Sequence, residues 1–166
     1  MNLIGIDLGI HKISLACFTG DQLVWADTHG VPPEQCRSLQ LRELAAFAHD
    51  ITHMHGAESV WVEDTIIGNN RKYSIQLAQV MGAVLASLGA QHLHQGTDVR
   101  VVDNRVWKKA VVGAGHASKD QIKDYIHVTY PAYAPLCGED QDLYDATCVG
   151  LYGLSIIERA KSLQLG

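Results

Sequence analysis

The segment at residues 2–28, NLIGIDLGIHKISLACFTGDQLVWADT, decides the fold. Its apolar residues form three runs, at residues 2–7, 11–18 and 22–28. Gly20-Asp21, between the second and third runs, is a turn signal. Successive strands joined by short turns pair side by side, so the segment predicts an antiparallel meander. The first run ends at Asp7, which places a carboxylate at the end of a buried strand.

Beyond this meander, strand and helix patterns alternate along the chain. Two more strands are expected at residues 58–63 and 98–102. Apolar residues at helical spacing predict helices at residues 39–51, 71–92, 104–111, from Ser118 onward and at 140–163. The order predicts one α/β domain over residues 1–166. Its five-stranded mixed sheet has three antiparallel strands and then parallel ones, with helices on both faces.

The composition is that of a globular protein with a core of its own. The chain has 166 residues, of which 47% are hydrophobic and 19% charged. We expect no membrane partner, because no apolar run reaches membrane-spanning length and no signal peptide precedes the first strand. The four cysteines are scattered, which favours free thiols in a reducing cytosol and therefore a cytoplasmic location.

The net charge of −5 is unevenly distributed. Residues 71–123 carry eight basic and three acidic groups, whereas residues 1–70 carry three basic and nine acidic groups and residues 124–166 two basic and six. The middle third could therefore present a basic surface to phosphates. A solvated surface of mixed charge would give the same count, so this asymmetry alone does not decide between the two interpretations.

Four carboxylates stand where strand and helix ends can bring them together. Asp7 closes the first strand and Glu63 closes the fourth, so the two meet at one edge of the sheet if these strands are neighbours. Asp142 and Asp145 are three residues apart at the start of the last helix, and therefore share one of its faces.

Carboxylate oxygens are the ligands that Mg²⁺ prefers, and two such ions can clamp a phosphodiester for in-line attack by water. The sequence therefore predicts a metal-dependent nuclease. Its four metal ligands would be Asp7, Glu63, Asp142 and Asp145, and two Mg²⁺ ions, replaceable by Mn²⁺, would be its only cofactors.

Four motifs in this order resemble the RuvC family of Holliday-junction resolvases, which have a ribonuclease-H-like fold. The first is Gly5-Ile6-Asp7-Leu8-Gly9, and the second is Glu63 with the spacing Asn70, Leu77, Gln79, Gly82 behind it. The third, KKAVVGAGHASK at residues 108–119, is the most particular to the family, and the fourth is Asp142-Leu143-Tyr144-Asp145-Ala146. The short, divergent chain is consistent with a phage-encoded member, which would act in an infected host cell.

The resemblance implies a catalytic site, a substrate and an assembly. The four carboxylates would hold the metals, and Lys119 would stabilise charge on the phosphate. A homodimer would place two active sites on the arms of a four-way DNA junction. Forks and flaps are further expected substrates, and the cut ends would carry a 5′-phosphate and a 3′-hydroxyl. The residues expected to contact DNA are Ile66, Asn70, Arg71, Lys72, Lys108, Lys109, His116 and Lys119.

Two features bear on how the dimer and the junction are handled. We expect the stripe of Leu77, Met81, Val84 and Leu88 to pack against its two-fold mate as well as against the sheet. The family often has an aromatic residue at the position of Ile66, so the sequence predicts weaker opening of the junction centre and a broader choice of substrates.

Three other functions compete with junction resolution. A ribonuclease H acting on RNA–DNA hybrids would share the acids and metals but not the lysine–glycine stretch. A non-catalytic junction-binding module would not need all four acids. An ATPase of the sugar-kinase or actin type shares Gly5-Ile6-Asp7-Leu8-Gly9, but needs two related domains, and this chain has room for one.

Overall fold

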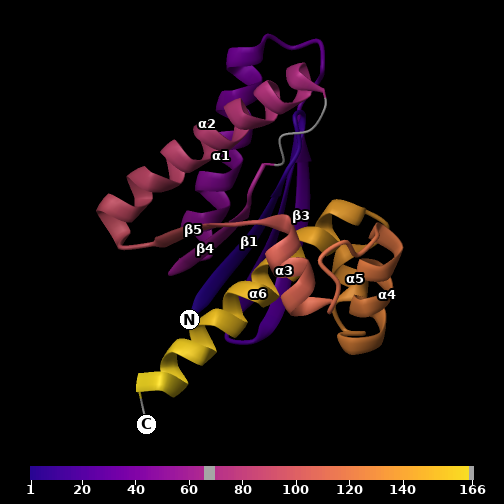
Figure 1. The fold of residues 1–166 in the computed structure, drawn as a ribbon. Helices are drawn as coiled ribbons and strands as arrows, with labels where there is room; N and C mark the ends of the chain where they lie inside the picture. The colour runs from indigo at the N-terminus through magenta and orange to yellow at the C-terminus, as the bar shows by residue number, and fades with distance from the viewer. Residues whose placement is uncertain (66–69, 165–166) are drawn as a thin grey trace.

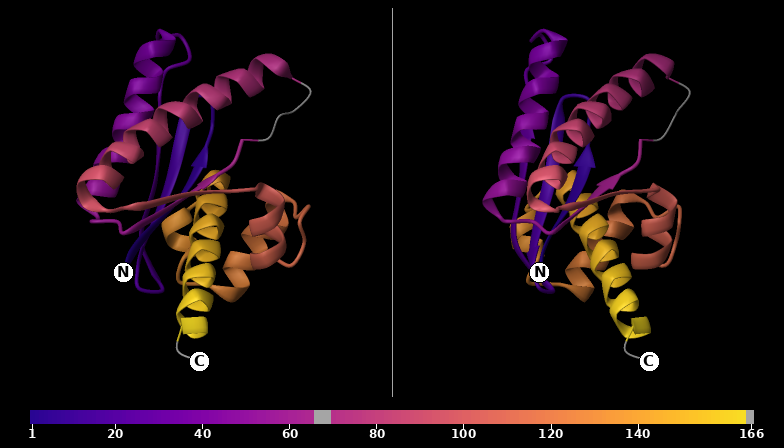
Figure 2. Two further views of the ribbon diagram at one scale, coloured as in Figure 1. Left: turned by 60° about the vertical axis from the view of Figure 1, so that its left-hand side comes forward. Right: turned by 90° about the vertical axis from the view of Figure 1, so that its left-hand side faces the viewer.

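A five-stranded mixed sheet stands between two layers of helices (Figures 1 and 2). The structure, a computed structural model, describes residues 1–65 and 70–164, without the side chains of residues 91–95. The strands are β1 (Asn2–Leu8), β2 (Lys12–Thr19), β3 (Gln22–Gly30), β4 (Ser59–Glu63) and β5 (Asp98–Val102), in the order β3-β2-β1-β4-β5. The first three pair antiparallel, and β4 and β5 continue the sheet in parallel, which confirms the predicted architecture.

The predicted helices are all present among the described residues. They are α1 (Arg37–Met54), α2 (Arg71–Gln95), α3 (Asn104–Val111), α4 (Lys119–Thr129) and α6 (Gln141–Gln164). Ser118 caps α4 as expected, because its hydroxyl accepts from the backbone N–H of Gln121 while the Gln121 side chain accepts from the N–H of Ser118. The sequence did not predict the single turn α5 (Ala134–Cys137).

Each face of the sheet builds its own core. Along β1, side chains alternate between faces, so Ile4 and Ile6 pack against α1 and α2 while Leu3 packs against α6. The same alternation puts Asp7 on the α6 face. In β4, Trp61 belongs to the α6 core, so Glu63 two residues later also faces that side. The sheet therefore presents both carboxylates to the helix that carries the other two.

Two glycines let α6 cross the sheet at close range. A Cβ atom on Gly5 would lie 2.2 Å from the backbone oxygen of Ala146 and 2.4 Å from the backbone nitrogen of Gly150. A Cβ atom on Gly150 would lie 2.3 Å from the ring of Phe18. No real Cβ sits so close to other atoms, so this approach requires glycine at both positions. The contact fixes the start of α6 beside the end of β1.

The apolar stripe of α2 corrects one expectation. Leu77, Met81, Val84 and Leu88 are all buried in the core that α2 shares with α1 and the sheet. They cannot also pack against a second copy, because the chain's own sheet already covers them.

Over Arg71–Ala90, α2 is also long and apolar enough to cross a membrane by its length and composition alone, contrary to the expectation that no segment would be.

Candidate metal-ion site

The ends of β1 and β4 bring Asp7 and Glu63 together. Ile6 pairs with Val62 in the parallel register, so the two carboxylates occupy the next positions on adjacent strands. They line one cavity of about 200 Å³ together with Asp64, Thr65 and Tyr73. The predicted meeting of these two acids at one edge of the sheet is confirmed.

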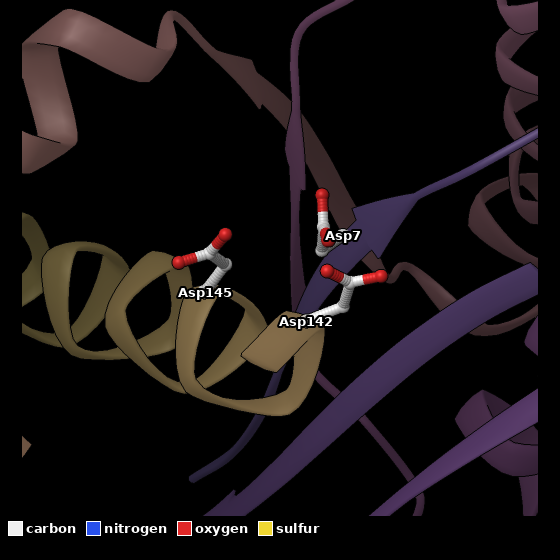
Figure 3. Close-up of side chains that lie close together, drawn as sticks. All are labelled: Asp7, Asp142 and Asp145. Atoms are coloured by element: carbon white, nitrogen blue, oxygen red, sulfur yellow. The ribbon is translucent and has the colours of Figure 1, made fainter. Parts of the chain in front are cut away.

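The N-terminal part of α6 adds two more acids, Asp142 in its first turn and Asp145 in the next. Figure 3 shows Asp142 and Asp145 on α6 with their carboxylates close to that of Asp7 on β1. Oxygen atoms of these three side chains all lie within 4.8 Å of one another. Glu63 is not part of this group of three, but it lines the other cavity together with Asp7. Asp7 therefore belongs to both sets of oxygen donors.

Asp145 is buried, and Asp7 and Glu63 are partly buried, which disfavours the charged forms of all three carboxylates. Burial raises the pKa of Asp7 well above its ordinary value, and the neighbouring charges of Glu63 and Asp145 raise this pKa further. Burial raises the pKa of Asp145 to about 6. The pKa of Glu63 is also raised by burial, against a hydrogen bond that the Asn104 amide donates to its Oε1.

These buried acids also have unused hydrogen-bonding capacity. Neither Oε2 of Glu63 nor Oδ1 of Asp145 has a hydrogen-bond partner in the part of the chain that the structure describes. A buried oxygen without a partner costs about 1–3 kcal/mol, and more when it is charged. A hard divalent cation would satisfy both atoms and offset the repulsion between the acids, so the residues present fit such an ion.

Asp142 lies at the rim and is in a different situation. Lys12 Nζ lies 2.6 Å from its Oδ2, and Lys119 Nζ lies 3.3 Å from its Oδ1. Lys12 Nζ also lies 3.4 Å from Oδ1 of Asp140, which accepts a hydrogen bond from the backbone N–H of Asp142 at the start of α6. The chain thus supplies its own cations at the rim.

A second cavity, of about 450 Å³, opens on this side of the site. Its lining includes Asp7, Lys12, Lys119, Asp142 and Asp145. The lining therefore includes both acids and ammonium groups, which meet at Asp142. This distribution suits a bound phosphate, whose oxygens can face the lysines while metal ions separate it from the carboxylates.

The other basic side chains predicted to bind DNA differ in whether they act on the carboxylates. Lys108 is partly buried, with its Nζ 5.3 Å from the centre of the Trp107 ring, and its positive charge lowers the pKa of Asp145 and of Glu63 against the larger effect of burial. The remaining predicted groups have exposed side chains: Arg71, Lys72, Lys109 and His116. The structure brings Lys119 and Lys108 nearest the carboxylates, and leaves the others available to more distant phosphates.

Two predicted DNA contacts stand apart. Asn70 is exposed, and its side chain accepts a hydrogen bond from the backbone N–H of Tyr73, so it caps the start of α2 whatever else it binds. Ile66 lies outside the described residues.

Sequence reasoning missed three residues of the site. Lys12 reaches Asp142 from the start of β2, a contact between residues 130 positions apart. Tyr73 is an exposed aromatic side chain, 43% accessible, that lines both cavities. Asn104 is the first residue of α3, shortly after the end of β5. The parallel pairing of β4 with β5 brings this position to the same edge of the sheet as Glu63.

Comparisons with known proteins agree with this geometry. Residues 3–131 match the family described as "Crossover junction endodeoxyribonuclease RuvC". Proteins of that name from Azorhizobium caulinodans and Hyphomonas neptunium are both 27% identical to the chain, over 91% and 79% of its length and 88% and 78% of theirs. The family match includes Asp7 and Glu63; the carboxylates of α6 lie beyond it.

Solved structures show the same fold. Thermus thermophilus RuvC, known alone and in complex with a Holliday junction substrate, superposes with a TM-score of 0.72 at 20% identity over 92% of both chains. The yeast mitochondrial Holliday junction resolvase gives a TM-score of 0.62 at 10% identity, over 92% of this chain and 77% of its own.

Proposed function

The chain belongs to the RuvC family of nucleases, and from this premise we propose that it is a metal-dependent endonuclease that cuts Holliday junctions. One observation carries the proposal: Asp7, Asp142 and Asp145 have carboxylate oxygens within 4.8 Å of one another. Two buried oxygens in and beside this group, on Asp145 and Glu63, lack a hydrogen-bond partner among the described residues. Buried acids are destabilising as anions unless a cation lies among them, and a bound divalent ion would supply that cation.

The position of Asp7 favours a site for two ions. Asp7 lines both cavities, with Glu63 in one and with Asp142 and Asp145 in the other. It would therefore be the shared ligand of two Mg²⁺ ions, and Mn²⁺ would substitute because it accepts the same hard oxygen donors. When bound, these ions would polarise the phosphate and lower the pKa of a water molecule.

The lysines would act on the phosphate rather than on the metal. Lys119 already lies beside the carboxylates, so its ammonium group would stabilise the charge that builds on the phosphate oxygens. Water attacks phosphorus, the bond from phosphorus to the 3′-oxygen breaks, and that oxygen takes up a proton. The fragments would carry a 5′-phosphate and a 3′-hydroxyl. The other DNA contacts would be Asn70, Arg71, Lys72, Lys108, Lys109 and His116.

A homodimer would let two such sites act on one junction. With the stripe of α2 buried, the surface proposed for dimer contact is the outer face of this helix. Ile75 is 51% exposed there, Ala78, Gly82 and Ala86 are also exposed, and nothing lies within 4 Å of a Cβ built on Gly82. The helix has no charged residue after Lys72, so this outward face is uncharged, and Gln79 is a polar residue among its apolar ones.

A charge on that face tests the dimer. Gly82→Glu should give folded monomers by sedimentation, which cut a junction without pairing the two incisions. Met81→Glu is the contrasting variant and should unfold the chain, because Met81 is buried. A stable monomer for the unmodified chain at micromolar concentration would contradict the proposed dimer.

The substrate range should extend beyond four-way junctions. An aromatic side chain can stack on an unpaired base with about 1–3 kcal/mol per base, whereas isoleucine offers no such face. With isoleucine at position 66, forks and flaps should be cut nearly as well as four-way junctions, at several positions on each arm. Ile66→Phe should sharpen the choice; a single dominant site in the unmodified protein, with forks left uncut, would refute this.

The function itself is tested by a panel of DNA substrates. The full chain is incubated in Mg²⁺ or in EDTA with a four-way junction, a fork, a flap, an RNA–DNA hybrid and linear duplex. We expect cutting of the branched DNAs in Mg²⁺ alone, with ligatable 5′-phosphate ends. Preference for the hybrid would instead assign a ribonuclease H, and junction binding without any cutting would assign a non-catalytic module.

The cytoplasmic location stays a prediction.

A further inference from the structure

Lys12 holds one of the proposed metal ligands. The residue opens β2, just across the turn from the end of β1, where Asp7 lies. Its Nζ is 2.6 Å from Oδ2 of Asp142, the shortest ion pair between this carboxylate and any lysine, and its side chain is 43% exposed. Lys119 engages the other oxygen of the same carboxylate at 3.3 Å. Both oxygens of Asp142 therefore face ammonium groups.

A metal ion and the Lys12 ammonium group compete for the same atom. Mg²⁺ binds carboxylate oxygens at about 2.0–2.1 Å, on the lone pairs that an ammonium group otherwise uses. An ion held between Asp7, Asp142 and Asp145 would stand within a few ångströms of Lys12 Nζ, since the oxygens of these three acids lie within 4.8 Å of one another. Like charges at that range repel strongly.

We infer that Lys12 is an internal competitor for the metal: its ammonium group occupies Asp142 until a divalent cation displaces it, and so weakens metal affinity. The inference rests on the proposed metal-dependent function. Lys12 has room to leave, because it lines the open cavity of about 450 Å³ and its stem is flexible. Lys119 is 66% exposed and farther from Asp142, so it offers a weaker obstacle.

If Lys12 competes with the metal, removing its charge should have two opposite effects that other roles of this residue would not produce. Without metal, the Lys12 charge offsets the repulsion among the clustered acids, so its removal should destabilise the protein. With metal, the same charge is a cost, so its removal should tighten binding. A residue that merely positions Asp142 for the metal would lose binding when it is removed, and a residue that merely contacts DNA would change neither quantity.

The test measures Mn²⁺ binding to the full chain without DNA, by electron paramagnetic resonance of the free ion. Lys12→Met should lower the Kd for Mn²⁺ about tenfold, the order expected for removing one charge some 5 Å from a divalent ion in a largely aqueous surrounding. Lys12→Arg keeps the charge and should stay within about threefold of the unmodified protein. Lys161→Met removes a charge from the far end of α6 and should change the Kd less than twofold.

Thermal unfolding in EDTA supplies the second reading. Lys12→Met should lower the midpoint, and saturating Mn²⁺ should raise it by more than in the unmodified protein. Lys12→Gln, which keeps a polar head, guards against a variant that fails to fold and should show the same two changes. An unchanged or weakened Mn²⁺ affinity in folded Lys12→Met or Lys12→Gln would overturn the inference alone. Absence of Mn²⁺ binding by the unmodified protein would overturn the proposed function together with it.

Discussion

The inner and outer carboxylates of the acidic site have different electrostatic surroundings. The inner carboxylates, Asp7, Glu63 and Asp145, are held by the sheet and by the buried face of α6, and burial raises the pKa of each. The outer carboxylate, Asp142, lies at the rim between the ammonium groups of Lys12 and Lys119. Asp145 and Asp142 are the same residue type on the same helix, yet among the described residues no ammonium group lies within ion-pair distance of Asp145, whereas two lie beside Asp142.

The difference indicates where an external cation is needed. The chain places no ammonium group within ion-pair distance of the inner acids among the residues that the structure describes, and two of their oxygens lack any hydrogen-bond partner there. Buried charges without partners are strongly destabilising, so in the proposed function it is the inner acids that need an external cation. At the rim, the lysines meet solvent and, in the proposed function, the DNA phosphate.

Removing an inner carboxylate should have the largest effect. Asp7→Asn, Glu63→Gln and Asp145→Asn should each reduce Mg²⁺-dependent cutting of a four-way junction by about 10³-fold or more, because several kcal/mol of transition-state stabilisation depend on the metals. Junction binding, measured by gel shift in Ca²⁺ or EDTA, should persist or tighten. Asp50→Asn, at an exposed acid on α1 that lines neither cavity of the site, is the matched control and should cut normally. Normal cutting by two of the three variants would remove the basis for the inner site.

The pH dependence of stability should separate the two parts next. The pKa of Asp145 is about 6 in the folded protein, above its ordinary value of 3.8, so the folded state binds protons more tightly than the unfolded state. The metal-free protein should therefore lose stability as the pH rises from about 4 to about 7, by at most about 3 kcal/mol from this residue.

Urea unfolding in EDTA at pH 5 and pH 8 measures that loss. Mg²⁺ or the variant Asp145→Asn should flatten the dependence, since each removes the unpaired buried charge. A metal-free protein that grows more stable across this range would show that Asp145 has a partner and that the contrast between inner and outer acids is wrong.

At the rim, charge should matter through the substrate. Lys119→Ala should slow cutting by about 10²-fold if its ammonium group stabilises charge in the transition state. Lys109→Ala is the comparison within the same motif and should do much less, because its side chain is exposed and makes no described contact with the acids. Single-turnover rates at saturating protein separate the chemical step from binding. If both variants lost DNA binding equally and neither had a slower chemical step, Lys119 would only attract DNA and would not stabilise the transition state.

The smallest expected effects are the stability changes caused by Asp145→Asn and by Asp142→Asn, which should have opposite signs. In EDTA at pH 8, Asp145→Asn should stabilise the protein by roughly 1–2 kcal/mol, because it removes a buried charge that has no ion-pair partner. Asp142→Asn should be neutral or destabilising by roughly 1 kcal/mol or less, because it breaks two ion pairs that are partly exposed. Equilibrium unfolding in urea measures both. Shifts of the same sign would mean that the two carboxylates share one environment.

Local patterns predicted the skeleton of the site well. Asp7 and Glu63 meet because strand ends in parallel register meet, and the burial of both strands was visible in their apolar runs. Asp142 and Asp145 share a face because three residues make nearly one helical turn. Ser118 begins α4 because its hydroxyl and Gln121 form a capping box, which residue type and spacing suggest by themselves.

What the sequence could not show depends on contacts between distant segments. The pairing of Lys12 with Asp142 requires the start of β2 to meet the start of α6, and no periodicity reports that. The stripe on α2 was recognised as apolar, but its wrong assignment to a second copy arose because a pattern shows that a face is buried and not which surface buries it. Gly5 was recognised as part of a motif, but the sequence did not show why glycine is needed there. A Cβ atom at this position would lie 2.2 Å from the backbone oxygen of Ala146, which is 141 residues away in the sequence.

The most direct test of the account is to locate bound Mn²⁺ in crystals of the protein by anomalous diffraction at the manganese edge. We expect one anomalous peak in contact with Asp7, Asp142 and Asp145, and a second beside Asp7 and Glu63, with Lys12 Nζ withdrawn from Asp142. Peaks confined to the outer side of Asp142, or no peak in contact with Asp7 at saturating Mn²⁺, would contradict this expectation.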